Sequence, residues 1–162
     1  MLILGVDPGT ARLGWGTVID KNNQQTVGEY GCLETKKTLP ESQRLLSLFQ
    51  GFTKLLKKFH PDAVAVEDLF FFKNQKTVIK VSQARGVILV ASELLGLPVF
   101  SYTPLQVKSS VTGYGRADKN QVQQMTKNIL KLEFIPQPDD AADALAVALT
   151  HAFSHQLKNK LK

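Results

Sequence analysis

Apolar and polar residues follow one another along the chain with two different periods, one typical of strands and one typical of helices. Short apolar or alternating runs predict strands at residues 2–6, 14–20, 26–35, 63–67 and 98–103. Apolar positions three and four residues apart predict helices at residues 42–59, 77–95, 104–112, 118–132 and 139–154. Residues 70–76 are expected to form a loop.

The order of these elements indicates an α/β fold. The first three strands follow one another, and the polar stretch 21–25 is a plausible hairpin turn, so we expect an antiparallel meander. The later strands are separated by helices, which predicts crossover connections in a mixed five-stranded sheet with helices on both faces. We expect one domain over residues 1–156 and a disordered basic tail over residues 157–162.

One predicted helix is apolar all round. Within residues 77–95, the stretch 87–91 reads Val-Ile-Leu-Val-Ala. A helix without a polar side is buried on every side, and the sheet covers only one of them. The other cover is either a second copy of the chain or the last helix, and the sequence leaves this choice open.

Acidic residues stand where two of the predicted strands end. Asp7 follows the apolar run 2–6, and Glu67 closes the run 63–67. If the two strands are neighbours, both carboxylates lie at one edge of the sheet, where α/β proteins form crevices. The alternative is that Asp7 only forms a turn and that Glu67 marks the exit of its strand into solvent.

Three more acids open the last predicted helix, namely Asp139, Asp140 and Asp143. Asp140 and Asp143 are about 60° apart around a helix axis and Asp139 and Asp143 about 40°, so either pair can face one site. The alternative is that these acids cap the helix and interact with its dipole. Spacing alone does not decide between the pairs.

The combination of these acids predicts a metal site. Buried carboxylates that lie together repel one another unless a cation or a proton neutralises them. Oxygen ligands without Cys or clustered His favour Mg²⁺, which Mn²⁺ can replace. Two such ions in one site are the usual arrangement for hydrolysis of a phosphodiester.

Composition narrows the partners and the location. The 162 residues include 20 Lys and Arg against 14 Asp and Glu, and this excess of positive charge favours a polyanion such as nucleic acid. Cys32 is the one cysteine, which excludes a disulfide framework and a cysteine-based zinc site and makes the cytoplasm the expected location. No apolar run has the length of a membrane span.

His151 and His155 are expected at a solvated helix end.

Six motifs follow one another along the chain. They are Leu-Gly-Val-Asp-Pro-Gly-Thr (4–10), Leu-Gly-Trp-Gly (13–16), Ala-Val-Glu (65–67), Ser-Gln-Ala-Arg-Gly (82–86), Gln-Val-Lys (106–108) and Asp-Ala-Ala-Asp-Ala-Leu-Ala (140–146). In content and order they resemble the motifs of RuvC-type Holliday junction resolvases. The resemblance implies a ribonuclease H-like fold and a Mg²⁺-dependent homodimer that nicks two opposed strands of a four-way DNA junction. It further implies products with 5′-phosphate ends and cooperation with the RuvA and RuvB branch-migration proteins.

The resemblance also assigns site residues. The four acids of the family match Asp7, Glu67, Asp140 and Asp143. We expect them to hold two Mg²⁺ ions and to be the catalytic residues, with Asp7 between the ions. The additional acids Asp68 and Asp139 are interpreted as bystanders.

Aromatic and basic residues suggest a DNA-binding surface. Phe70 is followed by Lys73, Lys76 and Lys80, a combination that suits stacking on unpaired bases and pairing with phosphates. The alternative is that the aromatic residues here pack in the core. The resemblance implies that Phe70 stacks at the crossover and that Lys108 and Lys119 lie near the scissile phosphate; without it they are surface lysines.

Three other functions fit parts of the pattern. Residues 7–14 also match the first phosphate loop of actin-like ATPases, although 162 residues hold only one of the two lobes that such proteins need. The other two are a non-catalytic nucleic-acid-binding module and a different nuclease of the same fold.

Overall fold

A computed structural model describes residues 1–68 and 75–160, and it contains the predicted elements in the predicted order. The strands are β1 (Leu2–Asp7), β2 (Arg12–Lys21), β3 (Gln24–Glu34), β4 (Ala63–Glu67) and β5 (Val99–Tyr102). The helices are α1 (Glu41–Phe59), α2 (Gln75–Glu93), α3 (Pro104–Thr112), α4 (Lys119–Ile129) and α5 (Asp139–Lys160).

The five strands form one mixed sheet in the order β3-β2-β1-β4-β5. β1, β2 and β3 are antiparallel neighbours, and β4 and β5 run parallel to β1. Asn22 and Asn23 both have positive φ, so the turn between β2 and β3 is two residues long, shorter than the stretch 21–25. The predicted meander with crossover strands is confirmed.

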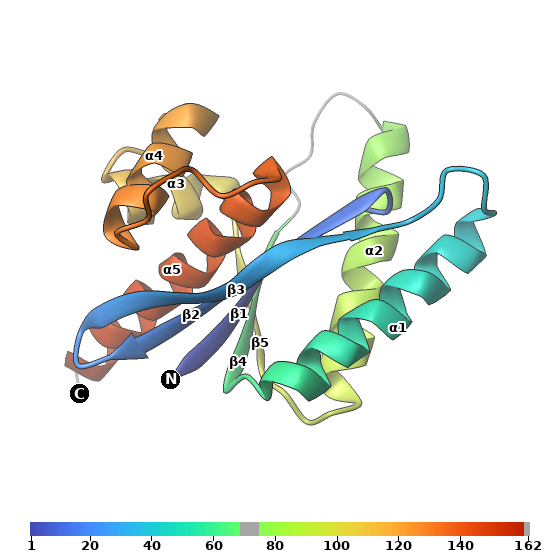
Figure 1. The fold of residues 1–162 in the computed structure, drawn as a ribbon, viewed down its shortest axis with the longest axis horizontal. Coiled ribbons are helices and arrows are strands. Elements are labelled where there is room, and N and C mark those ends of the chain that lie inside the picture. The colour runs from blue at the N-terminus through green and yellow to red at the C-terminus, as the bar shows by residue number, and fades with distance from the viewer. Residues whose placement is uncertain (69–74, 161–162) are drawn as a thin grey trace.

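Helices cover both faces of the sheet, as predicted (Figure 1). α1 and α2 pack on one face over a core that includes Leu4, Val64 and Phe52. On the other face, α3, α4 and α5 enclose a second core around Ile3, Ala65 and a run of small residues in α5. Alternate residues of β1 and β4 point into the two cores, which explains why both strands are apolar throughout.

Two glycines let α5 lie directly on the sheet. A Cβ at Gly5 would overlap the backbone carbonyl of Ala144, and a Cβ at Gly14 would overlap the backbone carbonyl of Asp140. Because Gly14 is also the register partner of Asp7, the first turn of α5 is placed above the end of β1. This contact positions the acids of α5.

Two apolar residues of α2 and one that follows this helix are exposed. Ala84 and Ile88 are buried among α1 and the sheet, whereas Ile79, Val90 and Leu94 are exposed. α5 lies on the opposite face of the sheet and covers none of these three residues (Figure 1). Of the two covers considered for this helix, the last helix is therefore the wrong one.

Helix ends differ from the sequence prediction in three places. α2 begins at Gln75, so Lys76 lies in a helix and not in the expected loop. α4 ends at Ile129, and Lys131 has a positive φ that stops the helix before residue 132. α5 continues to Lys160, so residues 157–160 of the expected tail are helical. The boundary after residue 156 stays a prediction.

In the described part of the chain, no helix is long and apolar enough to cross a bilayer.

Candidate active site

Two acids lie side by side where the central strands end. Asp7 is the last residue of β1 and Glu67 the last residue of β4. The two strands are parallel neighbours, with Val6 beside Val66, so their terminal acids share one edge of the sheet. This is the position at which α/β sheets form crevices.

The first turns of α5 bring two more acids to the same edge. Asp140 lies over Gly14, the register partner of Asp7, and Asp143 follows about one helical turn later. Their side chains are about a quarter exposed, at 28% for Asp140 and 26% for Asp143. Asp139 is 55% exposed, so its side chain is more open to solvent than those of the other two acids.

The pKa of Asp7 responds to the charges of the other three acids. Burial and the charges of Glu67, Asp143 and Asp140, in that order, raise the pKa of Asp7 to about 8, while Lys119 opposes the shift. Burial and Asp143 raise the pKa of Glu67 to about 7, against Lys108 and Lys119. The neighbouring negative charges that contribute to these shifts also favour a cation beside the two carboxyls, which would take the place of the proton.

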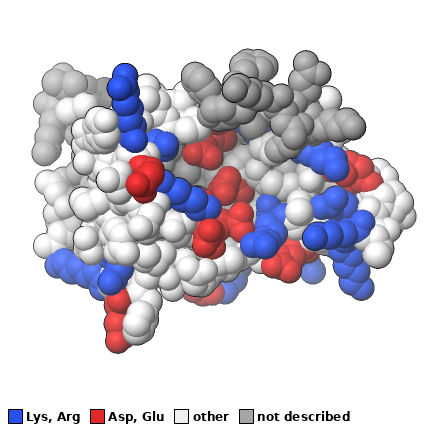
Figure 2. Space-filling view, turned by 90° about the horizontal axis from the view of Figure 1, so that it is seen from above, with Lys and Arg blue, Asp and Glu red and all other residues white. Residues whose placement is uncertain are grey.

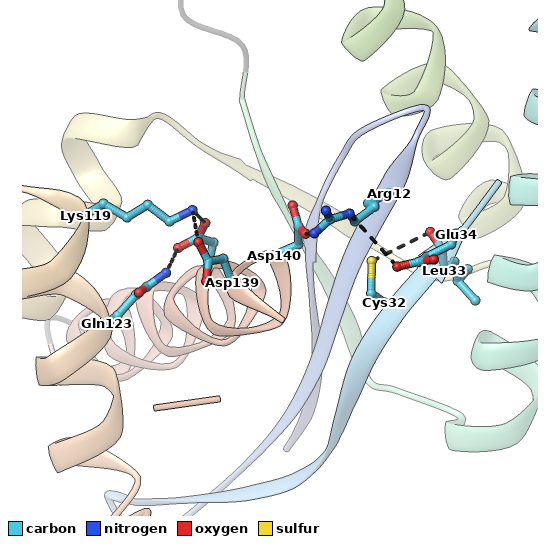
Figure 3. A network of polar contacts seen from close by, with 9 residues as sticks. Arg12, Cys32, Leu33, Glu34, Lys119, Gln123, Asp139 and Asp140 are labelled. Carbon is cyan, nitrogen blue, oxygen red and sulfur yellow. Dashed lines mark hydrogen bonds and ion pairs between the residues drawn. The ribbon is translucent and has the colours of Figure 1, made fainter. Parts of the chain in front are cut away.

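Two basic side chains neutralise the acids of α5 (Figure 3). Arg12 Nη1 lies 3.2 Å from Asp140 Oδ2. Lys119 Nζ lies 3.0 Å from Asp143 Oδ2 and 3.3 Å from Asp139 Oδ2. Partial burial acts to lower the pKa of Lys119, but its bonds to Asp143 and Asp139 outweigh that effect and raise it.

The donor set fits a divalent cation by its chemistry. Four carboxylates within electrostatic reach of one another, with no neutral or sulfur ligand among them, are the hard oxygen donors that Mg²⁺ or Mn²⁺ prefers. Among residues 1–68 and 75–160, no three acidic, His or Cys side chains already stand close enough to hold an ion. Binding therefore requires the acidic side chains to draw closer together, and Arg12 and Lys119 compete with an ion for Asp140 and Asp143.

Two hollows flank the acids. The larger, of about 380 Å³, is lined by the turn 9–12, Lys80, Val81 and Asp140. The smaller, of about 190 Å³, is lined mainly by α3, α4 and α5 and contains Glu67 and Asp143 together with Lys108 and Lys119. Figure 2 shows acidic side chains in the middle of this face with basic side chains on both sides of them.

This structure and its sequence identify the family. The family model described as crossover junction endodeoxyribonuclease RuvC matches residues 3–151. The chain belongs to the RuvC family. The crossover junction endodeoxyribonuclease RuvC of Desulfitobacterium hafniense is 52% identical over 161 residues, which cover 99% of this chain and 98% of that protein.

Solved structures agree with this assignment. The structure of Thermus thermophilus RuvC matches with a TM-score of 0.90 and 37% identity over 98% of this chain and 97% of that one. The same protein in complex with Holliday junction substrate matches with a TM-score of 0.91 at 37% identity, over 98% of this chain and 96% of that one.

The lysines expected on the DNA side of this RuvC family member fall into two groups. Lys80 lines the larger hollow, and Lys108 and Lys119 line the smaller one. Phe70 and Lys73 lie outside the described residues, as does the side chain of Lys76. Their assignment as DNA contacts stays a prediction.

Two polar contacts of the acids were not predicted. Arg12 pairs with Asp140 across 128 positions of sequence, and Gln123 Nε2 donates to Asp143 Oδ1 over 3.2 Å. No local pattern marks either residue, because each partner comes from a different element. Asp68, one of the two extra acids, pairs with Arg85 over 3.4 Å.

The expectation of a solvated helix end is wrong for His151. This side chain is buried, and its Nδ1 lies 2.7 Å from the hydroxyl of Tyr102. The reason is that α5 extends beyond residue 154 and packs beside β5, where Phe100 also contacts the imidazole ring.

Proposed function

We propose that this chain is a structure-selective endonuclease that resolves Holliday junctions in DNA recombination and repair. The observation that carries the proposal is that Glu67, Asp140 and Asp143 lie within electrostatic reach of the buried Asp7 in a chain of the RuvC family. The Thermus protein that it resembles is known in complex with a Holliday junction.

In this proposal the four acids hold divalent metal, with Mg²⁺ as the expected ion in two positions. The metal would supply activation of a water for attack on the scissile phosphate and stabilisation of the leaving 3′ oxygen. The acids orient what they bind, since Asp7 and Glu67 are fixed to the ends of paired strands. Hydrolysis with a leaving 3′ oxygen gives a 5′-phosphate at each nick, ready for ligation.

The basic residues beside the acids would bind the DNA backbone. Lys108 and Lys119 share a hollow with Glu67 and Asp143, so a phosphate there would lie against the acids. Lys119 has two tasks in this scheme. It neutralises Asp143 without metal, and it is free to contact a phosphate once a metal ion replaces it on Asp143.

A nicking assay tests the function. We expect the protein with Mg²⁺ to cut a synthetic four-way junction on two opposed strands, and to leave a linear duplex of the same sequence intact. The products are read on a sequencing gel, and re-ligation without a kinase reports the 5′-phosphate. Binding of the junction without any nick in Mg²⁺ or Mn²⁺ would favour the alternative of a non-catalytic module.

We also propose that the protein is a homodimer joined through α2. Ile79 and Val90 of α2 are exposed, as is Leu94 just after the helix, and a second copy is the cover that remains after α5 is excluded. Two active sites in one particle would allow paired nicks.

We further propose that the protein cooperates with RuvA and RuvB and acts in the cytoplasm. Joint retention of the three proteins on junction DNA tests the cooperation.

Replacing Val90 with Glu is expected to convert the dimer to a monomer. Val90 is 56% exposed in the single chain, so the substitution does not disturb the core but places a charge in the proposed interface. Light scattering after gel filtration measures the change. Phe134→Glu is the matched control, since Phe134 is 72% exposed and precedes α5 on the other side of the sheet. A V90E protein that keeps the mass of the wild type would contradict this interface.

A further inference from the structure

The larger hollow beside the acids has features that the proposed metal site does not use. Its volume of about 380 Å³ lies within the range of ligand pockets, roughly 300–1,000 Å³. Arg12 comes from the start of β2 and Lys80 from α2, and both line it. Asp140 is the one acid in the lining. Two cations and one acid around an open pocket suit an anion that carries one negative charge.

Arg12 is held where it can exchange partners. Its guanidinium lies 3.2 Å from Asp140 and 4.0 Å from Glu34, and its side chain is 54% exposed (Figure 3). Ion pairs as exposed as these contribute little stability and break readily. A metal ion on Asp140 would compete with Arg12 for the same carboxylate and leave the guanidinium facing the hollow.

The turn 9–12 fixes the place of Arg12. A Cβ at Gly9 would overlap the carbonyl oxygen of Arg12, so the turn is tight and needs glycine at this point. Thr35 N–H donates to Ala11 O, and Thr35 Oγ1 donates to Thr10 O, which ties the turn to the end of β3. The backbone of Arg12 is therefore anchored, while its side chain is held only by exposed ion pairs to Asp140 and Glu34.

We infer that this hollow is a phosphate subsite for the DNA strand that is being cut. Arg12 and Lys80 bind a backbone phosphate that neighbours the scissile one, on the side of the acids opposite Lys108 and Lys119. A strand held in both hollows crosses the acids between them, which places a phosphodiester over Asp7 and Glu67. Arg12 is thus a positioning residue that passes from Asp140 to DNA. The inference rests on the proposed function.

Salt dependence of junction binding is the first test. In an Asp7→Asn background with Mg²⁺, where we expect the junction to stay intact, Arg12→Gln and Lys80→Gln should each weaken binding about tenfold. Each should also reduce the slope of log K against log salt by about one, the signature of a lost phosphate contact. Lys57→Gln is the matched control, because Lys57 is exposed near the end of α1, at the opposite edge of the sheet. A salt slope for R12Q equal to that of K57Q would overturn the inference.

Neutral linkages locate the phosphate. A series of junctions is made in which a single backbone phosphate beside the cleavage point is replaced by an uncharged methylphosphonate. At one of these positions, the replacement should weaken binding by the protein that retains Arg12 about tenfold and leave binding by R12Q unchanged. If Arg12 only stabilises Asp140, R12Q will alter the Mg²⁺ concentration needed for cleavage and show no such position, which would also overturn the subsite. Failure of the wild-type protein to cut the junction would instead refute the proposed function, so the two failures are distinguishable.

Discussion

We expect replacement of Asp7 with Asn to reduce junction cleavage by at least about a thousandfold and to leave junction binding intact. Asp7 is the last residue of β1 and lies beside Glu67. The charges of the other three acids all raise its pKa, so it is the central member of the group. Loss of a ligand that fixes metal removes charge stabilisation in the transition state, which accounts for an effect of this size. Binding persists because the change removes a negative charge that repels DNA.

The same substitution should stabilise the metal-free protein at neutral and basic pH. Burial and the neighbouring acids raise the pKa of Asp7 from 3.8 to about 8. Between these two values the folded state binds more protons at this site than the unfolded state, so the wild type loses stability as the pH rises. Because Asn does not ionise, D7N does not lose stability through this position as the pH rises. We expect the two proteins to unfold at similar temperatures near pH 4 and D7N to unfold at least about 5 °C higher at pH 8.

Thermal unfolding in EDTA and gel-based single-turnover cleavage measure the two effects. Asp62→Asn is the matched control, since Asp62 accepts a hydrogen bond from Leu2 N–H at the start of β1, at the far end from the site. D62N should cut at the rate of the wild type. Cleavage by D7N within tenfold of that rate would remove Asp7 from the site, and with it the assignment of the metal ligands.

Gly14→Ala is expected to displace α5 and to remove both stability and activity. The new Cβ would overlap the backbone carbonyl of Asp140, which cannot move as a flexible side chain would. Overlap of this kind in a packed interior costs about 3 kcal/mol, or about 10 °C in unfolding temperature for a chain of this length. Since Asp140 shifts with the helix, cleavage should fall at least about a hundredfold even at temperatures where the protein is folded.

Calorimetry and the nicking assay report on G14A together. Ser47→Ala is the control, because Ser47 is exposed on α1, away from the contact between α5 and the sheet, and an alanine there is expected to be neutral or to stabilise the helix by up to about 0.5 kcal/mol. A G14A protein with wild-type unfolding temperature and activity would show that α5 does not depend on this contact for its position.

Much of the fold was predictable because it follows from local periodicity. The apolar runs of β1 and β4 and the helical stripe of α1 placed these elements to within a residue or two. The same runs showed that Asp7 and Glu67 stand at strand ends, and parallel pairing of β1 and β4 makes those ends adjacent. Helix ends were less accurate, as in α4 and α5, because caps and packing partners fix them more than propensity does.

What the sequence determined by itself is therefore the set of elements, the positions of the acids along them and, through ordered motifs, the RuvC family. The tertiary structure alone decided that α2 and α5 lie on opposite faces of the sheet and that Arg12 pairs with Asp140. These features depend on contacts between residues more than a hundred positions apart. For example, Gly5 and Gly14 have no side chain, which allows α5 to pack directly on the sheet. A local pattern carries no information about such contacts, because it records the period of each element and not its neighbour in space.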